Sequence, residues 1–310
     1  MKIAFLCSGQ GAQAAGMGKS LYDEYAVCRE TFDAADTALG FSISKLCFDG
    51  GEQLGETEYA QPAILTHSMA AFRLLQENGI APDYAAGLSL GEYSALTAAG
   101  VFAFEDAVKL VRRRGRLMAE AAPPGTGAMS AILGMEDAAA EAACAEVSTA
   151  GETVICANYN APGQIVLSGA VAAVERAEAL CLERGAKRAV RLQVSGPFHS
   201  AYMQAAAEGL RPELDAMVIS PFVFPVVTNV TAEIIPCVGN VPQILLAQIQ
   251  SPVRWTQSIQ MLAALGVDTF VEIGPGRTLC AFVKKIVKDA TILNVEDAAS
   301  FEKTMAALRG

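Results

Sequence analysis

A five-residue turn at Gly87–Gly91 (GLSLG) constrains the fold more than any other segment of the chain. It follows a short apolar run at 84–86 and precedes an apolar-periodic run at 92–99, which predicts a strand, a sharp turn and a helix. The two glycines let the chain bend tightly, and the bend exposes the hydroxyl of Ser89. The helix behind it offers unpaired N–H groups to a developing oxyanion, so the turn indicates acyl transfer through an acyl-serine. The alternative is a glycine-rich turn with an incidental serine.

Composition limits the class of protein in which such a turn can occur. The chain has 310 residues, of which 52% are hydrophobic and 18% charged, which is typical of a globular protein of about two domains. No apolar run approaches the ~18 residues that cross a bilayer, and we expect no signal peptide and no membrane partner. The eight cysteines form no C-x-x-C pair, so we expect no metal site and a cytoplasmic location. The net charge of −10 argues against nucleic acid as a partner.

The order of the predicted elements indicates two units. Up to residue 121, strand-like and helix-like segments alternate, with helical runs at 18–33, 62–78 and 104–121, which favours a parallel α/β sheet. The segment 123–127, rich in proline and glycine, interrupts this pattern. The following residues show the order β-α-β-β-α-β of a ferredoxin-like unit. Its strands are predicted at 128–133, 153–157, 164–167 and 187–194 and its helices at 136–147 and 171–184. We therefore predict an α/β-hydrolase-like core at 1–125 and 195–310, with a ferredoxin-like subdomain inserted at 126–194.

Ser89 needs a general base, because a serine hydroxyl is a weak nucleophile. The chain has two histidines. His67 lies in the middle of an apolar helical run, which is typical of a core residue. His199 lies in a loop directly after the predicted insert, where catalytic side chains tend to occur, so it is the candidate base. A buried capping histidine is the alternative. No carboxylate suggests itself as a third member, so a backbone or amide carbonyl is expected to orient the imidazole.

Several further motifs occur in one order along nearly the whole chain. They are Ser8–Gln13 (SGQGAQ), Gly87–Ala95 (GLSLGEYSA), Arg114-Gly115, Asn158–Gln164 (NYNAPGQ), Gly196–Ser200 (GPFHS), Gln248, Pro252–Trp255 and Gly274–Gly276. Together they resemble the malonyl-CoA:acyl carrier protein transacylases of fatty acid synthesis and the acyltransferase domains of polyketide synthases. One position departs from that family, which commonly has histidine before the nucleophile where this chain has Leu88. We expect Leu88 to point to the opposite side of the strand from Ser89 and to take no part in the chemistry.

The resemblance implies a ping-pong transfer of a malonyl group from malonyl-CoA to the phosphopantetheine thiol of an acyl carrier protein. Ser89 would attack the thioester, and His199 would accept the proton and return it to the leaving thiolate. The backbone N–H groups of Gln10 and Leu90 would form the oxyanion hole. Gln248 would orient His199 through its main-chain carbonyl, which explains why no carboxylate was found.

The resemblance also implies which residues bind the acyl group. Arg114 lies 25 residues after Ser89, where the family has the arginine that binds the malonyl carboxylate. A solvated arginine face on its helix is the alternative, because three more arginines lie close by. Phe198 matches the malonyl-selective form of the histidine loop. The further substrate-binding residues are Asn160 and Met118.

The expected partners follow from the same resemblance. We expect an acyl carrier protein, a coenzyme A thioester as substrate, no permanently bound cofactor or metal, and a monomer. Basic residues for an acidic carrier occur at Lys187-Arg188 with Arg191, and at Lys284-Lys285 with Lys288. Three alternatives stay open: an acyltransferase that serves a polyketide assembly line, a serine thioesterase or hydrolase, and a catalytically idle docking protein that keeps the fold.

Overall fold

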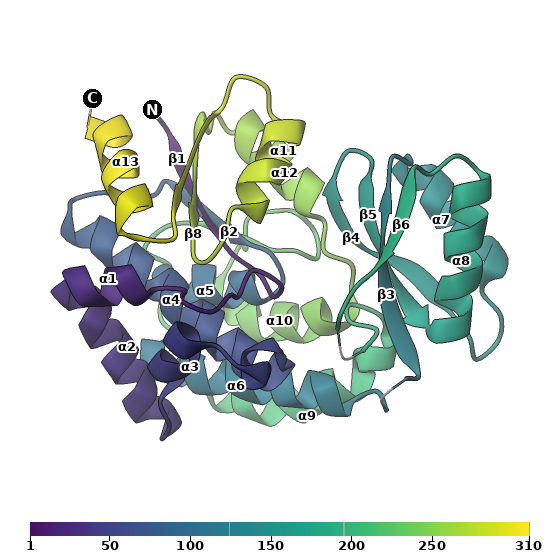
Figure 1. Ribbon diagram of the computed structural model, residues 1–310, viewed down its shortest axis with the longest axis horizontal. Coiled ribbons are helices and arrows are strands. Elements are labelled where there is room, and N and C mark those ends of the chain that lie inside the picture. The colour runs from purple at the N-terminus through teal and green to yellow at the C-terminus, as the bar shows by residue number, and fades with distance from the viewer. Residues whose placement is uncertain (124, 195, 310) are drawn as a thin grey trace.

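Two separate sheets organise the fold, and each has its own layer of helices (Figure 1). The computed structural model describes residues 1–123, 125–194 and 196–309. Pro124, Ser195 and Gly310 lie outside the described residues, so the predicted start of the second core segment at Ser195 is not described. The predicted fold class, an α/β core with a parallel sheet and a second, ferredoxin-like unit, is confirmed.

The large sheet is parallel, with strand order β7-β2-β1-β8-β9. Its strands are β1 (Ile3–Cys7), β2 (Tyr84–Gly87), β7 (Val226–Val227), β8 (Thr269–Ile273) and β9 (Thr291–Val295). Helices cover both faces, which explains why β1 and β8 are buried along their whole length and why β1 is apolar throughout. Ile3 and Phe5 belong to one hydrophobic cluster, and Ala4 and Leu6 belong to another on the opposite face.

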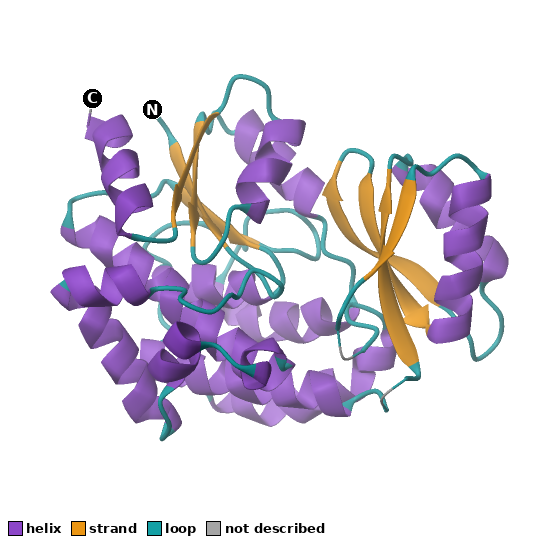
Figure 2. Ribbon diagram, viewed as in Figure 1, coloured by secondary structure: helices purple, strands orange, loops and turns teal. Residues whose placement is uncertain are grey.

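The helices of the large body account for most of its length (Figure 2). They are α1 (Lys19–Glu24), α2 (Ala26–Leu39), α3 (Ile43–Asp49), α4 (Thr57–Glu77), α5 (Leu90–Ala98), α6 (Phe104–Glu120), α9 (Gln204–Ala216), α10 (Val241–Gln250), α11 (Trp255–Ala264), α12 (Thr278–Ile286) and α13 (Ala298–Arg309), with short 3-10 turns at Glu52–Gly55, Ala201–Met203 and Val238–Asn240. The predicted alternation of strands and helices is wrong between β1 and β2, because four helices follow one another there.

The helix predicted at 18–33 is broken at Tyr25, which has an extended backbone between α1 and α2. The break lets the Tyr25 ring pack edge-on against Phe301 at 5.2 Å and its hydroxyl donate to Glu302 at 2.9 Å. These contacts reach the C-terminal helix, so local sequence could not reveal them. Helix α4 also differs from its prediction, since it begins at Thr57 and contains Pro62.

The small sheet is antiparallel, with strand order β4-β5-β3-β6. Its elements are β3 (Gly127–Leu133), α7 (Asp137–Val147), β4 (Val154–Ala161), β5 (Gln164–Ala170), α8 (Val171–Glu183) and β6 (Arg188–Arg191). This is the predicted βαββαβ order, although β6 is shorter than expected. Ile132, Ile165 and Val174 lie in a separate hydrophobic cluster beneath the two helices. These observations support our proposed division of the chain into 1–125 with 195–310 and 126–194.

The two bodies are joined by hydrogen bonds beside the end of β4. Tyr159 N–H donates to the Val253 carbonyl at 2.9 Å, and Val253 N–H donates to the Ala157 carbonyl at 2.8 Å. The Thr256 hydroxyl donates to the Tyr159 carbonyl at 3.0 Å. Strand β4 is therefore anchored to the segment that leads into α11. The predicted asparagine-containing hairpin is held against the large body in this way.

Candidate active site

Ser89 occupies a strained turn between β2 and α5. Its φ of 53° and ψ of −104° lie outside the regions that side chains prefer. The flanking glycines are required sterically: a Cβ on Gly87 would lie 1.9 Å from the Gly91 carbonyl carbon, and one on Gly91 would lie 2.1 Å from the Cys7 carbonyl oxygen. The GLSLG turn therefore forms the tight elbow that its spacing predicts.

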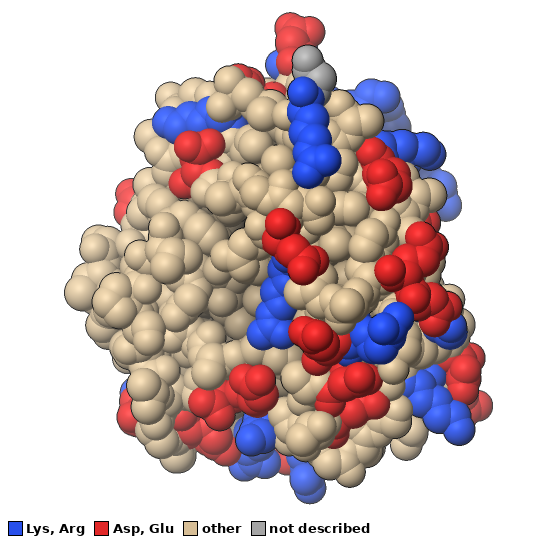
Figure 3. Space-filling view, turned by 90° about the vertical axis from the view of Figure 1, so that its left-hand side faces the viewer, with Lys and Arg blue, Asp and Glu red and all other residues tan. Residues whose placement is uncertain are grey.

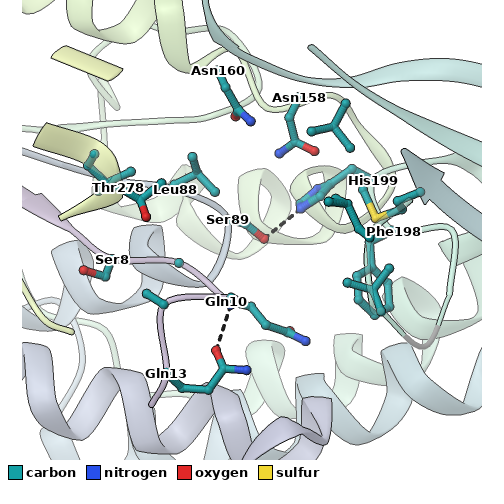
Figure 4. Close-up of a pocket in the computed structure, with 18 of the residues that line it drawn as sticks. Ser8, Gln10, Gln13, Leu88, Ser89, Asn158, Asn160, Phe198, His199 and Thr278 are labelled. Carbon is teal, nitrogen blue, oxygen red and sulfur yellow. Dashed lines mark hydrogen bonds between the residues drawn. The ribbon is translucent and has the colours of Figure 1, made fainter. Parts of the chain in front are cut away.

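His199 lies beside Ser89, and the two form a hydrogen-bonded pair (Figure 4). His199 Nε2 is 2.7 Å from Ser89 Oγ, and Nδ1 is 2.9 Å from the main-chain carbonyl oxygen of Gln248. A carbonyl only accepts, so Nδ1 carries the proton and Nε2 is free to accept the serine proton. Like Ser89, His199 has a left-handed backbone, with φ 57°.

The Gln248 carbonyl that holds His199 belongs to the last turn of α10. Carbonyl groups there lack the usual partner four residues on, and that of Gln248 also accepts from the Ser251 N–H at 3.4 Å. The C-terminal end of a helix carries partial negative charge. This charge stabilises the imidazolium that forms when His199 accepts a proton. No carboxylate is needed for that role.

Burial sets the protonation state of His199 in the resting site. The ring is 3% exposed, and burial, reinforced by the charge of Arg114, lowers the pKa of His199 from 6.5 to about 4. The imidazole is therefore neutral at neutral pH, which is the form that can accept a proton from serine.

This protonation state predicts the pH dependence of acylation. Protonation of His199 removes the base, so we expect the single-turnover rate of acylation to be flat from pH 8 to about pH 5 and to fall about tenfold per pH unit below pH 4. Rapid-quench measurement across this range checks it. An inflection near pH 6.5 would contradict the burial argument. His67→Gln is the control, because His67 is bound to the Glu296 carbonyl and does not line the cavity at Ser89, so its replacement should leave the profile unchanged.

Arg114 reaches the site from α6 and is 1% exposed. Its Nη2 is 3.2 Å from Ser89 Oγ and donates to Gln248 Oε1 at 2.9 Å, and its Nη1 donates to Gln61 Oε1 at 2.8 Å. The guanidinium also lies over the Tyr93 ring, 5.0 Å from its centre. Two neutral amides hold this cation beside the nucleophile, and within the described residues no carboxylate forms an ion pair with it. A substrate carboxylate is therefore the complementary group.

The arginines next to Arg114 lie on a solvated face of α6, which is the alternative that the sequence left open for Arg114 itself. Arg112, Arg113 and Arg116 pair with Glu58, Glu213 and Glu120, respectively, and these side chains are all partly or well exposed. Arg114 alone of this group is buried. The interpretation of a solvated face is therefore wrong for Arg114 and right for its neighbours.

The proposed oxyanion donors lie on two sides of the nucleophile. Leu90 is the first residue of α5, so its N–H is one of the donors that a helix leaves unpaired at its start. Gln10 lies on the loop after β1, and its side chain is held by a hydrogen bond from Nε2 to Thr57 Oγ1 at 3.1 Å. Figure 4 shows Gln10 across the cavity floor from Ser89. Their role as donors stays a prediction.

A cavity of about 410 Å³ opens above Ser89 between the two bodies. Met118, Asn160 and Phe198 all line it, as expected of substrate-binding residues. Asn158, which the sequence analysis named as part of a motif but not as a substrate-binding residue, also lines it (Figure 4). The buried Asn160 Oδ1 has no hydrogen-bond partner in the described part of the chain, so it is available to a ligand donor.

Leu88 lies in the same cavity, so the expectation that it points away from Ser89 is wrong. A Cβ on Gly9 would lie 3.0 Å from Leu88 Cδ2, so this side chain packs against the Gln10 loop. The alternation of side chains along a strand ends at Gly87, because Ser89 has a left-handed backbone. The strand period therefore no longer applies at Leu88.

Two negative findings apply to the described residues. Within residues 1–123, 125–194 and 196–309, no three or more histidine, cysteine, aspartate or glutamate side chains are grouped so that they could hold a metal ion. No helix there is both long enough and apolar enough to span a bilayer.

Comparison with known proteins gives matches along the whole chain. The family model described as "Acyl transferase domain" matches residues 4–305. The malonyl CoA-acyl carrier protein transacylase of Bacillus subtilis is 48% identical over 309 residues, which span 99% of this chain and 98% of that protein. The counterpart from Escherichia coli K12 is 44% identical over 292 residues, or 94% of each chain.

Solved structures match equally well. The malonyl CoA-acyl carrier protein transacylase of Clostridium perfringens superposes with a TM-score of 0.96 at 44% identity, covering 100% of this chain and 98% of that chain. A malonyl-transacylase in complex with its type II polyketide synthase acyl-carrier protein has a TM-score of 0.96 at 41% identity, with 99% and 100% covered. Both chains thus match over nearly their full length.

Proposed function

Because this chain belongs to the acyl transferase domain family, we propose that it transfers the malonyl group of malonyl-CoA to the phosphopantetheine thiol of an acyl carrier protein. One observation carries the proposal: the buried Arg114 guanidinium lies 3.2 Å from the Ser89 hydroxyl. A carboxylate bound to that guanidinium places a thioester carbonyl beside the nucleophile. The transfer supplies malonyl units for fatty acid synthesis.

The first half-reaction forms a malonyl-serine. Ser89 Oγ attacks the thioester carbonyl while His199 Nε2 accepts its proton. The oxyanion is stabilised by the N–H groups of Gln10 and Leu90. The tetrahedral intermediate then collapses, the C–S bond breaks, and His199 donates its proton to the thiolate of coenzyme A.

The second half-reaction runs through the same groups in reverse. The phosphopantetheine thiol of the carrier enters the cavity, and His199 accepts its proton as the sulfur attacks the malonyl-serine ester. The C–O bond to Ser89 breaks, and the proton returns to Oγ. Every step uses side-chain and backbone groups of this chain, and no resident cofactor or metal is required. We also propose that the protein works as a cytoplasmic monomer, as the resemblance implies.

Mass spectrometry of the intact protein tests this function. After incubation with malonyl-CoA, the protein should gain the mass of one malonyl group, and phosphopantetheinylated carrier protein should remove it. If no adduct forms, the acyl-serine mechanism is wrong. If water removes the adduct as fast as the carrier does, the protein is a hydrolase. Carrier protein without phosphopantetheine is the control, since it lacks the accepting thiol.

Arg114→Ala tests the recognition of the malonyl carboxylate. We expect kcat/KM for malonyl-CoA to fall about 100-fold, because the carboxylate loses a buried charged partner. The rate with acetyl-CoA should stay level or rise, since acetyl leaves the arginine unpaired. Steady-state transfer assays with malonyl-CoA and with acetyl-CoA measure how far the ratio of the two kcat/KM values changes. Arg113→Ala is the matched control, because Arg113 pairs with Glu213 at the surface. Equal losses with both substrates would contradict this role.

One solved relative favours a second pathway for the same reaction. It is a malonyl-transacylase in complex with a type II polyketide synthase acyl-carrier protein, and it matches 99% of this chain. Transfer rates to a fatty acid carrier and to a polyketide carrier, compared at equal concentration, distinguish the two pathways.

The carrier-binding surface is proposed to lie beside the cavity mouth. The face far from the small sheet mixes acidic and basic side chains and gathers no patch of one sign (Figure 3). Helix α12, in contrast, lines the cavity with Leu279 and Phe282 and carries Lys284 and Lys285 one turn further on. Lys285 also donates to Gln164 Oε1 of β5 at 2.9 Å. The other basic group expected from the sequence is Lys187-Arg188 with Arg191. Arg191 already forms ion pairs with Glu178 and Glu175, so the group on α12 is the better candidate for the carrier-binding surface.

A further inference from the structure

The strained backbone at Ser89 is supported by a side chain from a distant part of the sequence. Strand β7 ends at Val227, after pairing with Ala85 and Ala86 of β2. The peptide groups on either side of Leu88, which carry the Gly87 carbonyl and the Ser89 N–H, therefore extend beyond the last residue of β7 that could pair with them. An unpaired buried peptide group is costly, so something else must satisfy them.

Asn229 provides those hydrogen bonds with its side chain. Its Oδ1 accepts from Ser89 N–H at 2.7 Å, and its Nδ2 donates to the Gly87 carbonyl at 2.7 Å. A side-chain amide offers the same donor and acceptor as a peptide group. The Asn229 side chain therefore extends the hydrogen-bonded pairing of β7 with β2 as far as the elbow. It binds the peptide group before Leu88 and the one after it.

Asn229 is itself fixed in place. It is 1% exposed. Its N–H donates to Glu92 Oε2 at 3.1 Å, and its carbonyl accepts from Arg254 N–H at 3.0 Å. Glu92 lies on the first turn of α5 and is 0% exposed.

The same Glu92 oxygen also connects to the catalytic base. Gln248 Nε2 donates to Glu92 Oε2 at 2.7 Å and to the Ser89 carbonyl at 2.9 Å. The main-chain carbonyl of Gln248 in turn holds His199 Nδ1. Glu92 is thus linked both to the support of the nucleophile and to the residue that orients the base.

We propose that Asn229 and Glu92 are positioning residues: Asn229 holds the strained Ser89 turn, and Glu92 fixes Asn229 and Gln248 so that Ser89 Oγ and His199 Nε2 stay in contact. Neither side chain touches the reacting atoms. The inference rests on the proposed acyl transfer, although the support of Ser89 concerns any reaction of that hydroxyl. It predicts that both residues affect rates of Ser89 chemistry more than substrate affinity.

Asn229→Ala tests the first part. We expect single-turnover acylation to fall about 100-fold with malonyl-CoA and by the same factor with acetyl-CoA, since misplacement by about 1 Å costs rates of that order. The Kd for malonyl-CoA should change less than about twofold, because Arg114 is untouched. Labelling by a fluorophosphonate, which reacts with activated serines, should slow in parallel. Asn294→Ala is the control, because Asn294 is a buried asparagine at the end of β9 that does not contact the elbow.

Two results would overturn the role of Asn229. One is wild-type acylation and labelling rates in folded Asn229→Ala protein. The other is a loss confined to malonyl-CoA. If Asn229→Ala does not fold, Asn229→Asp is measured instead. The aspartate keeps an acceptor for the Ser89 N–H but places an oxygen where Asn229 Nδ2 donates to the Gly87 carbonyl. A wild-type acylation rate in Asn229→Asp would also overturn the positioning role of Asn229.

A pair of variants tests Glu92. Burial raises the pKa of Glu92 to about 7, so an uncharged side chain with the same acceptor suits the site. Glu92→Gln should slow acylation about threefold and Glu92→Met, which has a similar length but no strong acceptor, about 100-fold. Equal rates in Glu92→Met and wild type would exclude a positioning role. Equally slow acylation in Glu92→Gln and Glu92→Met would show that the charge of Glu92 matters, and not the oxygen that accepts from Asn229 and Gln248. That result would also contradict the proposal.

Failure of the two proposals can be told apart. If wild-type protein forms no malonyl adduct but fluorophosphonate labelling still slows in Asn229→Ala, then the proposed function fails and the support of Ser89 stands. If wild-type protein transfers malonyl and Asn229→Ala is labelled at the wild-type rate, only the positioning role fails.

Discussion

Ser89→Ala is expected to abolish the malonyl adduct, so that protein incubated with malonyl-CoA keeps its unmodified mass. Transfer to the carrier should fall by about 10⁵-fold, since loss of a serine nucleophile removes the covalent route. His199 Nε2 and Arg114 Nη2 both contact Ser89 Oγ, so the groups that activate a nucleophile converge on this hydroxyl. Intact-mass spectrometry after one minute and one hour with excess malonyl-CoA measures the loss.

Ser94→Ala is the matched control for this experiment. Ser94 lies on α5, the helix that begins directly after Ser89, is 0% exposed, and its hydroxyl has no hydrogen-bond partner among the described residues. The same chemical change there should leave the adduct at full yield. A stoichiometric adduct on the Ser89→Ala protein would mean that another residue carries the acyl group.

His199→Ala is expected to slow both half-reactions by about 10³-fold or more, since His199 is the one base in contact with Ser89 Oγ among the residues that the structure describes. Acylation slows because the serine keeps its proton. Discharge to the carrier slows because the entering thiol keeps its proton. The loss of rate below pH 4 should disappear as well, since its titrating group is gone. Rapid-quench measurement of acylation and of discharge gives the factor by which His199→Ala slows each half-reaction.

His67→Gln serves as the control for the loss of a histidine. His67 is 0% exposed on α4 and bonds through Nε2 to the Glu296 carbonyl at 2.9 Å. Its substitution should alter stability and leave both half-reactions near the wild-type rate. A comparable loss of rate in both variants would point to general disruption of the fold and not to the loss of a base.

Local patterns were enough to predict the elbow and the ferredoxin-like order. The GLSLG spacing predicted the turn at Ser89, because only glycine fits where a Cβ would lie about 2 Å from backbone atoms. The βαββαβ order followed from short apolar segments that alternate in type. Both signals lie within a few residues of the feature they describe.

Long-range packing explains what the sequence did not reveal. Asn229 reaches Ser89 across 140 positions, and its only local signal is that a polar residue follows the short strand Val226–Val227. Gln61, which holds Arg114, is one of several buried polar residues on α4, together with Thr66, His67 and Ser68, so its residue type alone did not reveal this contact. The break at Tyr25 depends on Phe301 and Glu302, and the error at Leu88 depends on the strained backbone that the Asn229 contact supports.

The acceptor that holds His199 Nδ1 is a peptide oxygen, and this has a consequence for mutagenesis. Every amino acid supplies that oxygen, so no substitution at position 248 deletes it. The effect of replacing Gln248 would report on its side-chain contacts with Arg114, Glu92 and the Ser89 carbonyl. Substitutions can only turn the carbonyl, by changing how α10 ends. Direct removal requires altered backbone chemistry, such as an ester in place of the peptide bond between residues 248 and 249, which weakens the oxygen as an acceptor. The acceptor for the base is thereby supplied by the path of the chain, whereas the side chains of Gln248 and Glu92 hold that part of the chain in place.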